Sequence, residues 1–258
     1  MPGRRTAGLA HDPGTDARRH TGTKLAIIGD GAVARACAAL AAARGHRVAR
    51  WSRCFTLAQD ITLAAEGALE GDFPVRQEAR AQACVRGAEA VAIVTSANGR
   101  RTVMQAIAPH LAPDVPVLVT PAMRLSPLVP RKLTEGRNHV GAMGTTPATA
   151  RVANTEAGAG VRVLTIRARV GIAGCRELAE ALWGEHDDDA PDLIAAALSN
   201  LNPIAHLAIA LCNVTRMEAR EAWPQYLNIT PAVCRLIEGL DRERLALAAA
   251  YGTFVPTA

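Results

Sequence analysis

Short aliphatic runs alternate with alanine-rich amphipathic stretches through the first two thirds of the chain. Residues 24–28 form an aliphatic run that ends in a glycine turn. Residues 32–44 follow with helical character, and residues 46–51 are a second strand candidate. A strand, a glycine turn, a helix and a strand within about 30 residues is the order that a right-handed crossover requires.

The alternation continues further along the chain. Residues 88–95 and 115–120 read as buried strands, with a helix over 101–111 between them. Residues 138–143 and 160–170 are also strand-like, and the second alternates enough to be an edge or antiparallel strand. Buried strands that alternate with helices predict the α/β class, with a Rossmann-type, doubly wound parallel sheet.

The pattern becomes helical after residue 174, where no strand signal remains. We therefore predict a disordered leader over 1–22, a dinucleotide-binding domain over 23–174, and an all-α substrate or dimerisation domain over 175–258. The expected helices of the last domain are 176–183, 193–197, 203–219 and 231–251.

Composition narrows the choice of partners. Of 258 residues, 49% are hydrophobic and 3% are aromatic, which suits an aliphatic globular core and argues against an aromatic platform for single-stranded nucleic acid. Part of the net charge of +5 comes from arginines in the first 22 residues. A weakly basic body fits a protein that handles anionic small molecules, so we expect no nucleic-acid partner.

Targeting and redox features point to the cytoplasm. No segment resembles a secretory signal, and none approaches the roughly 20 apolar residues of a spanning helix, so no membrane partner is expected. The six cysteines are far apart without a C-x-x-C pair, which favours free thiols over disulfides or zinc. The acidic residues 185–189 are typical of a solvated loop, and we expect no metal site.

The turn after the first strand carries the sequence G-x-G-x-x-A. Gly29 allows a tight turn, Gly31 lets a pyrophosphate approach the backbone, and Ala34 allows close packing of helix and strand. The N–H groups of Ala32 and Val33 would meet the phosphate charge at the start of the helix. We predict a dinucleotide site; the alternative is a Rossmann-like domain that has lost its cofactor.

Cofactor preference depends on the end of the second strand, where a site that prefers NAD carries Asp or Glu. This chain has Arg50-Trp-Ser-Arg53 instead. The Ser52 hydroxyl and the Arg53 guanidinium could hold a 2′-phosphate, which predicts NADPH rather than NADH. If one arginine only stacks on adenine or faces solvent, the preference stays open.

One of the seven histidines lies in a polar cluster on an otherwise apolar helical stretch. Asn202 is predicted to be the N-cap and Pro203 the first helical residue, so that His206 lies near the end of the first turn. There it could exchange a proton with a group reduced by hydride. A satisfied structural histidine is the alternative.

Three separated segments together resemble the opine dehydrogenase family of the octopine and nopaline type. The first is the G-x-G-x-x-A turn. The second is Gly144-Thr-Thr-Pro-Ala-Thr-Ala-Arg151, which is similar to the family's T-x-P-x-x-x-R segment. The third is Ser199-Asn-Leu-Asn-Pro-Ile-Ala-His206, followed by Ile229-Thr-Pro and by Asp241-Arg-Glu-Arg244.

The resemblance implies reductive condensation, in which an amino acid and a 2-oxo acid form an imine that NAD(P)H reduces. It implies His206 as the acid/base group, Asn202 at the entrance of its helix, Thr145 in contact with the 2-oxo acid, and Arg151 on cofactor or carboxylate. Family members that assemble opine metallophores prefer NADPH, in keeping with the reading of residues 52 and 53.

The chain departs from the family in one respect. The R-Y-x-x-E-D-like segment, which supplies an Asp to the histidine and an Arg to a substrate carboxylate, has no counterpart here; Glu218, Asp192 or Asp241 are possible substitutes for the Asp. Ala150 stands where some relatives have a bulkier or thiol residue.

Three functions therefore remain open. They are an opine-type reductase, an NADPH-dependent 2-oxo acid or ketone reductase, and a non-catalytic nucleotide-binding subunit. A homodimer is expected, because a short helical domain rich in Ala and Leu leaves an apolar face to cover.

Overall fold

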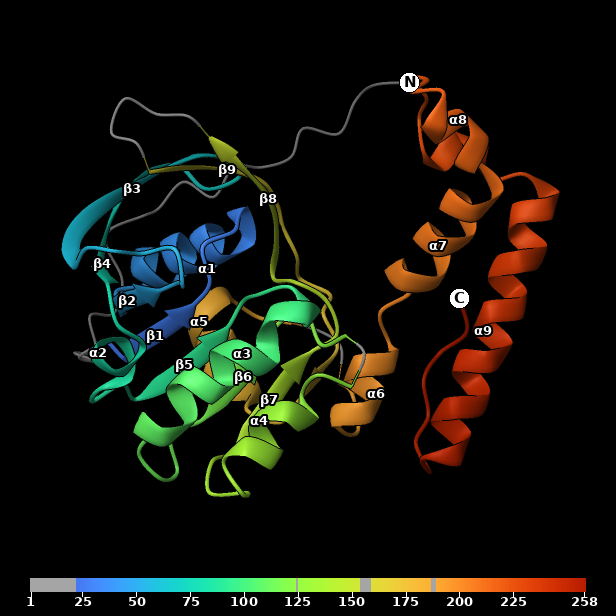
Figure 1. Ribbon diagram of the computed structural model, residues 1–258. Helices are drawn as coiled ribbons and strands as arrows, with labels where there is room; N and C mark the ends of the chain where they lie inside the picture. The colour runs from blue at the N-terminus through green and yellow to red at the C-terminus, as the bar shows by residue number, and fades with distance from the viewer. Residues whose placement is uncertain (1–21, 124, 154–158, 187–188) are drawn as a thin grey trace.

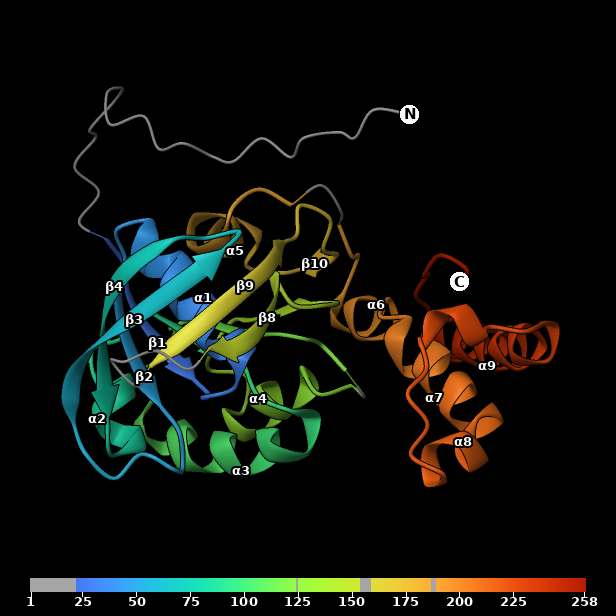
Figure 2. The same cartoon turned by 90° about the horizontal axis from the view of Figure 1, so that it is seen from above.

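The computed structural model describes residues 22–123, 125–153, 159–186 and 189–258. They form a ten-stranded mixed sheet with helices on both faces, and a group of helices extends from one side of it (Figures 1 and 2). This is the predicted α/β class, a Rossmann-type fold followed by an all-helical region. The predicted disordered leader lies outside the described residues except for Gly22.

Six parallel strands form the centre of the sheet, in the order β7-β6-β5-β1-β2-β4. The chain passes from β1 to β2 on one side and later returns to β5 on the other side of β1. A crevice for ligands therefore opens at the carboxyl ends of these strands. The strands are β1 (Lys24–Ile28), β2 (Arg47–Trp51), β4 (Gly71–Glu78), β5 (Ala90–Ile93), β6 (Val117–Val119) and β7 (Val140–Met143).

The sheet continues beyond its parallel centre. Strand β3 (Gln59–Gly67) pairs antiparallel with β4 and parallel with β9 (Gly160–Ile166), and β9 pairs antiparallel with β8 (Ala148–Ala153). Strand β10 (Ile172–Ala173) pairs antiparallel with β7. The sequence reading missed β3, β4 and β8. It predicted β9 to be an edge or antiparallel strand; β9 is antiparallel to β8, and β8 lies at the edge. The β3–β4 hairpin mixes polar with apolar residues and is half exposed, so it lacks the aliphatic run of a buried strand.

Alternate side chains of β1 serve two cores. Leu25 and Ile27 belong to the cluster beneath α1 and α5, while Ala26 and Ile28 belong to the cluster beneath α2, α3 and α4. Two-sided burial explains the continuous aliphatic run of this strand. These helices are α1 (Ala32–Ala43), α2 (Ala81–Val85), α3 (Ala97–Ile107), followed by the 3₁₀ turn η1 (Ala108–His110), α4 (Leu128–Leu133) and α5 (Arg176–Trp183).

Helix α1 is enclosed, because strands β9 and β8 curl over the face that it turns away from β1 (Figures 1 and 2). Five of its eight alanines are buried, and their small side chains let the helix approach strands on both sides. Helix α5 packs on α1, and the Trp183 indole N–H donates to the Cys37 carbonyl at 3.1 Å. The boundary near residue 174 stays a prediction, although α5 packs with the sheet domain.

The helical region contains α6 (Leu193–Leu198), α7 (Asn202–Cys212), α8 (Val214–Glu218), the 3₁₀ turn η2 (Tyr226–Asn228) and α9 (Pro231–Ala250). Helix α9 packs beside α7 and α6. The single helix expected over 203–219 is wrong, since it breaks at Asn213. There the Asn213 side-chain amide donates to the Ile209 carbonyl at 2.9 Å, a bond that competes with a continuing helix.

Among the described residues, Leu193–Cys212 reaches the length and apolar character of a membrane span, with a mean hydropathy of 1.5. This corrects the expectation that no stretch approaches that length. The structure divides the run into α6 and α7, with residues 199–201 in neither helix. Neither helix has the roughly 20 residues that a span requires.

Candidate functional site

A cleft of about 540 Å³ opens at the carboxyl ends of β1, β2 and β5. The turns after these strands meet there because the strands are parallel neighbours. Thr95 and Ser96 from the turn after β5, and Pro121 from the turn after β6, complete its wall. The lining includes all the residues predicted to bind the cofactor, Gly29, Gly31, Ala32, Val33, Ala34, Ser52 and Arg53.

The two glycines of the turn have different roles. Gly29 has φ +148°, and a Cβ there would lie 2.2 Å from the Val94 carbonyl oxygen, so only glycine fits between the strands. Gly31 precedes α1 with no side chain capping the helix, and a Cβ there would meet nothing within 4 Å. The open space and the uncapped N–H groups together fit a pyrophosphate on the helix N-terminus.

Asp30, between the two glycines, is held by two arginines. Its carboxylate accepts from Arg50 at 2.7 Å and lies 3.4 Å from Arg35. Arg50 is 1% exposed; burial lowers the pKa of its guanidinium, and Asp30 opposes this effect. Arg50 therefore neutralises Asp30, and Ser52 and Arg53 are the polar residues at the end of β2 that line the cleft, beside Trp51.

Arg100 of α3 supports the cleft from below, a role that the sequence reading missed. It is 1% exposed and donates to the carbonyls of Thr95 and Pro121 and to the Ser126 hydroxyl. Burial lowers its pKa to about 10. Because Thr95 and Pro121 both line the cleft, Arg100 fixes the turns after β5 and β6 relative to each other.

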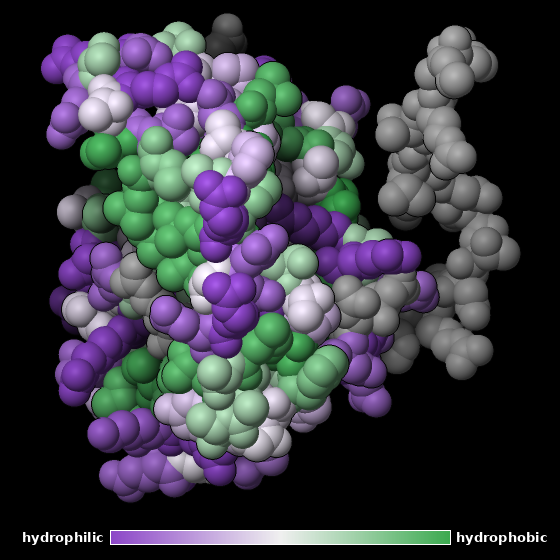
Figure 3. All heavy atoms as spheres, turned by 90° about the vertical axis from the view of Figure 1, so that its right-hand side faces the viewer, coloured by the Kyte–Doolittle hydropathy of each residue, from purple (hydrophilic) through white to green (hydrophobic). Residues whose placement is uncertain are grey.

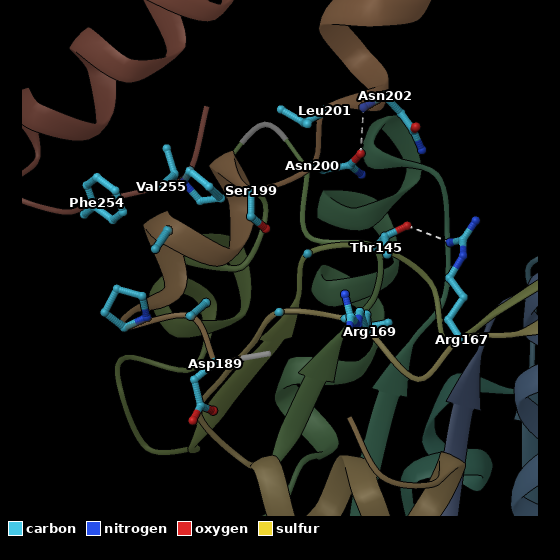
Figure 4. Close-up of a pocket in the computed structure, with 17 residues that line it drawn as sticks. Thr145, Arg167, Arg169, Asp189, Ser199, Asn200, Leu201, Asn202, Phe254 and Val255 are labelled. Atoms are coloured by element: carbon cyan, nitrogen blue, oxygen red, sulfur yellow. Dashed lines mark hydrogen bonds between the residues drawn. The ribbon is translucent and has the colours of Figure 1, made fainter. Parts of the chain in front are cut away.

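A second cleft of about 500 Å³ lies between the sheet and the helical region (Figure 4). Thr145 lines it from the segment after β7, and Asn202 lines it from the start of α7, so two of the predicted substrate residues meet here. Ser199 and Asn200 lie between α6 and α7 on the same wall. Arg167 and Arg169, which the sequence reading did not single out, enter from the segment between β9 and β10.

One segment joins the two clefts. Thr145 lines the second cleft and Thr146 lines the first. The Arg167 guanidinium donates to the hydroxyls of Thr145 at 2.8 Å, Thr146 at 3.0 Å and Thr149 at 2.9 Å. The Thr120 hydroxyl donates to the Thr145 carbonyl at 3.0 Å. The wall between the clefts is therefore fixed by Arg167 and by the turn after β6.

His206 lies on α7, four residues after Asn202 and about 6 Å further along the helix axis. It is exposed and lines neither cleft. Its Nε2 is 2.8 Å from the Tyr226 hydroxyl, and the two rings pack edge to face with centroids 5.8 Å apart. The structure therefore gives His206 a phenol as its partner.

None of the three carboxylates considered as partners contacts His206 among the described residues. Asp192 caps α6, accepting from the N–H groups of Ile194 and Ala195 at 2.7 and 2.8 Å. Asp241 pairs with Arg244 at 2.7 Å, and Glu218 is exposed on α8. Tyr226 was missed because it lies 20 residues beyond the histidine in an irregular segment.

Two further expectations need correction. Asn202 is not the N-cap of α7 but its first residue, and the Asn200 side chain accepts from the Asn202 N–H at 3.0 Å. Arg151 lines neither cleft; it is exposed on the edge strand β8, opposite Arg162. A bulge between residues 149 and 150 interrupts the alternation of side chains, so Arg151 does not follow Thr149 toward Arg167.

No group of three or more His, Cys, Asp or Glu side chains suited to a metal is found in the part of the chain that the structure describes. Residues 187 and 188 of the acidic segment lie outside that part. All six cysteines are free thiols. Burial raises the pKa of Cys84 to about 12, so this thiol is not a nucleophile at neutral pH.

Residues 189–258 match the family model described as NAD/NADP octopine/nopaline dehydrogenase, alpha-helical domain. An opine dehydrogenase from Arthrobacter sp. (strain 1C) is 27% identical over 248 residues, which cover 90% of this chain and 69% of that protein.

Solved structures share the fold. An octopine dehydrogenase in complex with NADH and agmatine superposes with a TM-score of 0.70 at 17% identity, covering 88% of this chain and 64% of that one. A PanE/ApbA family ketopantoate reductase from Ralstonia eutropha JMP134 gives 0.64 at 23% identity, covering 90% and 76%. The chain thus spans about two thirds of the length of the opine and octopine dehydrogenases. Residues 189–258 are thus similar to the alpha-helical domain of the octopine and nopaline dehydrogenases, and the chain shares its fold with octopine dehydrogenase.

Proposed function

We propose that the chain is an NADPH-dependent opine-type dehydrogenase, which condenses an amino acid with a 2-oxo acid and reduces the resulting imine. The observation that carries this proposal is the continuity of the two clefts. Thr145 and Thr146 are adjacent in the chain, and each lines a different cleft. A substrate beside Thr145 would lie next to a nicotinamide beside Thr146.

The substrate class rests on the relatives. Octopine dehydrogenase structures have been described with NADH and agmatine, with NADH and L-arginine, and with NADH and pyruvate. In the proposed reaction the amine and the ketone lose water to form a C=N bond. Reduction then places a hydride on carbon and a proton on nitrogen, which leaves a secondary amine.

The preference for NADPH rests on the end of β2. Ser52 and Arg53 face the first cleft, and the carboxylate nearest to the turn, Asp30, is already paired with Arg50 and Arg35. A 2′-phosphate would therefore meet a hydroxyl and a guanidinium rather than a free carboxylate. Replacing Arg53 with Ala is expected to lower the preference for NADPH over NADH about tenfold, measured by titration of each cofactor.

The chain's own groups have separate parts in the reaction. A nicotinamide held in the first cleft would supply the hydride. Thr145 contacts the 2-oxo acid, Asn202 shapes the entrance of α7, and His206 exchanges the proton, with Tyr226 holding its ring. Because His206 lies one helical turn beyond the lining of the second cleft, α7 must bring it to the substrate.

The test is oxidation of NADPH, followed by absorbance, with pyruvate or 2-oxoglutarate and with or without a mixed amino-acid pool. Wild type and His206→Ala are compared. Turnover that requires the amine and is lost in the variant supports the proposal. NADPH binding without turnover in either protein overturns it in favour of a non-catalytic nucleotide-binding subunit.

The second candidate is a 2-oxo acid or ketone reductase that never handles an amine. The structural likeness to ketopantoate reductases favours it. Turnover of the 2-oxo acid at the same rate without any amine selects this reading.

We also propose a homodimer, formed through the apolar face of α7 and α8. Leu207, Leu211, Val214 and Met217 are each between 47% and 58% exposed along these two helices. Covering them would remove apolar surface from water. Light scattering should give twice the chain mass for wild type and the monomer mass for Leu211→Glu; a monomeric wild type removes the proposal.

A further inference from the structure

The second cleft carries positive charge that no carboxylate of the described residues neutralises. The Arg167 guanidinium bonds only to neutral oxygens, those of Thr145, Thr146 and Thr149. Within the described parts of the chain, Arg169 makes no hydrogen bond or ion pair. An anionic ligand is the natural complement of this surface.

Asp189 does not supply the missing charge. Its carboxylate lines the same cleft but accepts from Arg176 Nε at 2.7 Å, and Arg176 Nη2 is 2.5 Å away. Figure 4 shows Asp189 below and to one side of the cleft, with its oxygens turned away from Arg169. The positive charge of Arg169 is therefore left for a ligand.

Arg167 and Arg169 differ in how they are held. Arg167 is tied to the wall between the clefts by bonds from both of its terminal nitrogens. Arg169 is exposed and has all its donors available. Figure 4 shows its guanidinium in the floor of the cleft, below the span between Ser199 and Thr145. The first arginine thus fixes the segment that presents the second.

We infer that Arg169 binds the carboxylate of the 2-oxo acid, and this assignment rests on the proposed function. The planar fork of a guanidinium donates two parallel bonds to a carboxylate, which fixes its orientation as well as its position. The Thr145 hydroxyl accepts from Arg167 and keeps its own proton to donate on the same cleft, whereas the Ser199 hydroxyl already donates to the Ala196 carbonyl at 2.9 Å.

The reaction itself indicates which carboxylate this is. The carbon that receives the hydride comes from the 2-oxo acid, and its carboxylate is attached directly to that carbon. The substrate group nearest to the first cleft is therefore the 2-oxo acid, and the wall of residues 145 and 146 is the border with that cleft. A carboxylate held by Arg169 beside Thr145 would place this carbon at the border.

The first experiment compares Arg169→Ala, Arg169→Lys and Arg137→Ala as steady-state variants. Arg137 is an exposed arginine just before β7. It therefore lies at the amino ends of the strands, whereas the clefts lie at their carboxyl ends. In Arg169→Ala the KM for pyruvate or 2-oxoglutarate should rise roughly 10- to 100-fold, the loss of a charge-assisted pair, while the Kd for NADPH stays unchanged. Arg169→Lys should recover part of the loss, and Arg137→Ala should behave as wild type.

The second experiment uses binding alone, so that the two proposals can fail separately. Oxalate, an unreactive dicarboxylate, is titrated calorimetrically into the NADPH-loaded protein and into the loaded Arg169→Ala variant. Weaker oxalate binding by the variant supports the carboxylate site even if no amine is ever turned over. Equal binding by both proteins, or turnover with an unchanged KM for the 2-oxo acid in Arg169→Ala, overturns the assignment to Arg169.

Discussion

The sheet domain and the helical region bury their apolar residues to very different extents. In β1, β5 and β6 nearly every side chain is inaccessible to water. In α7 only Ala208 and Ile209 are buried, and α8 has no buried residue. Figure 3 faces the helical region and shows hydrophobic surface between hydrophilic residues. Large exposed side chains of this region include Leu207, Leu211, Val214, Met217, Leu227, Leu247 and Phe254.

The difference separates the two halves of the proposed site. The cofactor half lies on strands that are fixed by two large cores, so its geometry is present before any ligand binds. The substrate half depends on how α7 is placed beside the sheet. That placement relies on small clusters and on one buried ion pair, between Asp241 and Arg244. Substitutions that perturb the sheet domain or the helical region separately therefore test whether the two regions differ in stability.

The largest effect is expected from Asp241→Asn. The ion pair is 7% and 5% exposed, and Arg244 also donates to the Leu198 carbonyl at 2.8 Å, which ties α9 to α6. Removing the Asp241 charge leaves the Arg244 charge buried without its partner, which should lower the free energy of unfolding by about 3 kcal/mol. Hydrogen exchange should quicken in α6 and α9 and stay slow in β1 and β5.

The control for this variant is Arg242→Ala, which removes an exposed charge one residue away. Its exchange rates should match wild type. Uniform quickening of exchange across the whole chain in Asp241→Asn would show that the two regions unfold as one unit, against the comparison.

The second effect is on binding and should leave stability alone. Gly31→Leu adds a side chain in open space at φ −63° and ψ 167°, angles that any residue adopts. The side chain would fill the room needed by a pyrophosphate, so NADPH affinity should fall at least about 100-fold with an unchanged Tm. Gly239→Leu, on α9, should leave NADPH affinity unchanged. If Gly31→Leu bound NADPH with wild-type affinity, the cofactor would not bind in this cleft.

The third prediction concerns acid stability. Burial lowers the pKa of His186 below its usual 6.5, and the backbone of Ala168, together with Glu180, opposes this only in part while Arg176 adds to it. The unfolded chain therefore binds the proton more readily, so this contribution to stability is intact above pH 6.5 and is lost as the pH falls. The Tm should drop between pH 7.5 and pH 5 in wild type and drop less in His186→Leu. His110→Asn, at an exposed histidine, should keep the wild-type dependence.

The smallest effect is expected at the partner of His206. Tyr226→Phe removes one hydrogen bond, of about 1 kcal/mol, so kcat should fall about fivefold while the KM values stay the same. Tyr251→Phe, another exposed tyrosine, should have the wild-type kcat. A fall in kcat that is equal in both variants would deny Tyr226 a role in holding the ring.

Sequence reading succeeded where neighbouring residues interact and failed where partners are distant. The strand, turn and helix over residues 24–43 were predicted because aliphatic burial and glycine geometry are local signals. Strands β3, β4 and β8 were missed because their stability comes from pairing with one another and with β9. Their own residues do not form the continuous aliphatic run of a buried strand.

The sequence by itself determined the Rossmann-type domain, seven of the residues that line the first cleft, and the resemblance to opine dehydrogenases. Only the tertiary structure decided that Arg50 neutralises Asp30, that Arg167 ties Thr145 and Thr146 together, and that Tyr226 rather than a carboxylate meets His206. These are contacts of side chains up to 22 residues apart in the chain. Such contacts depend on how strands and helices pack, and no local pattern encodes them.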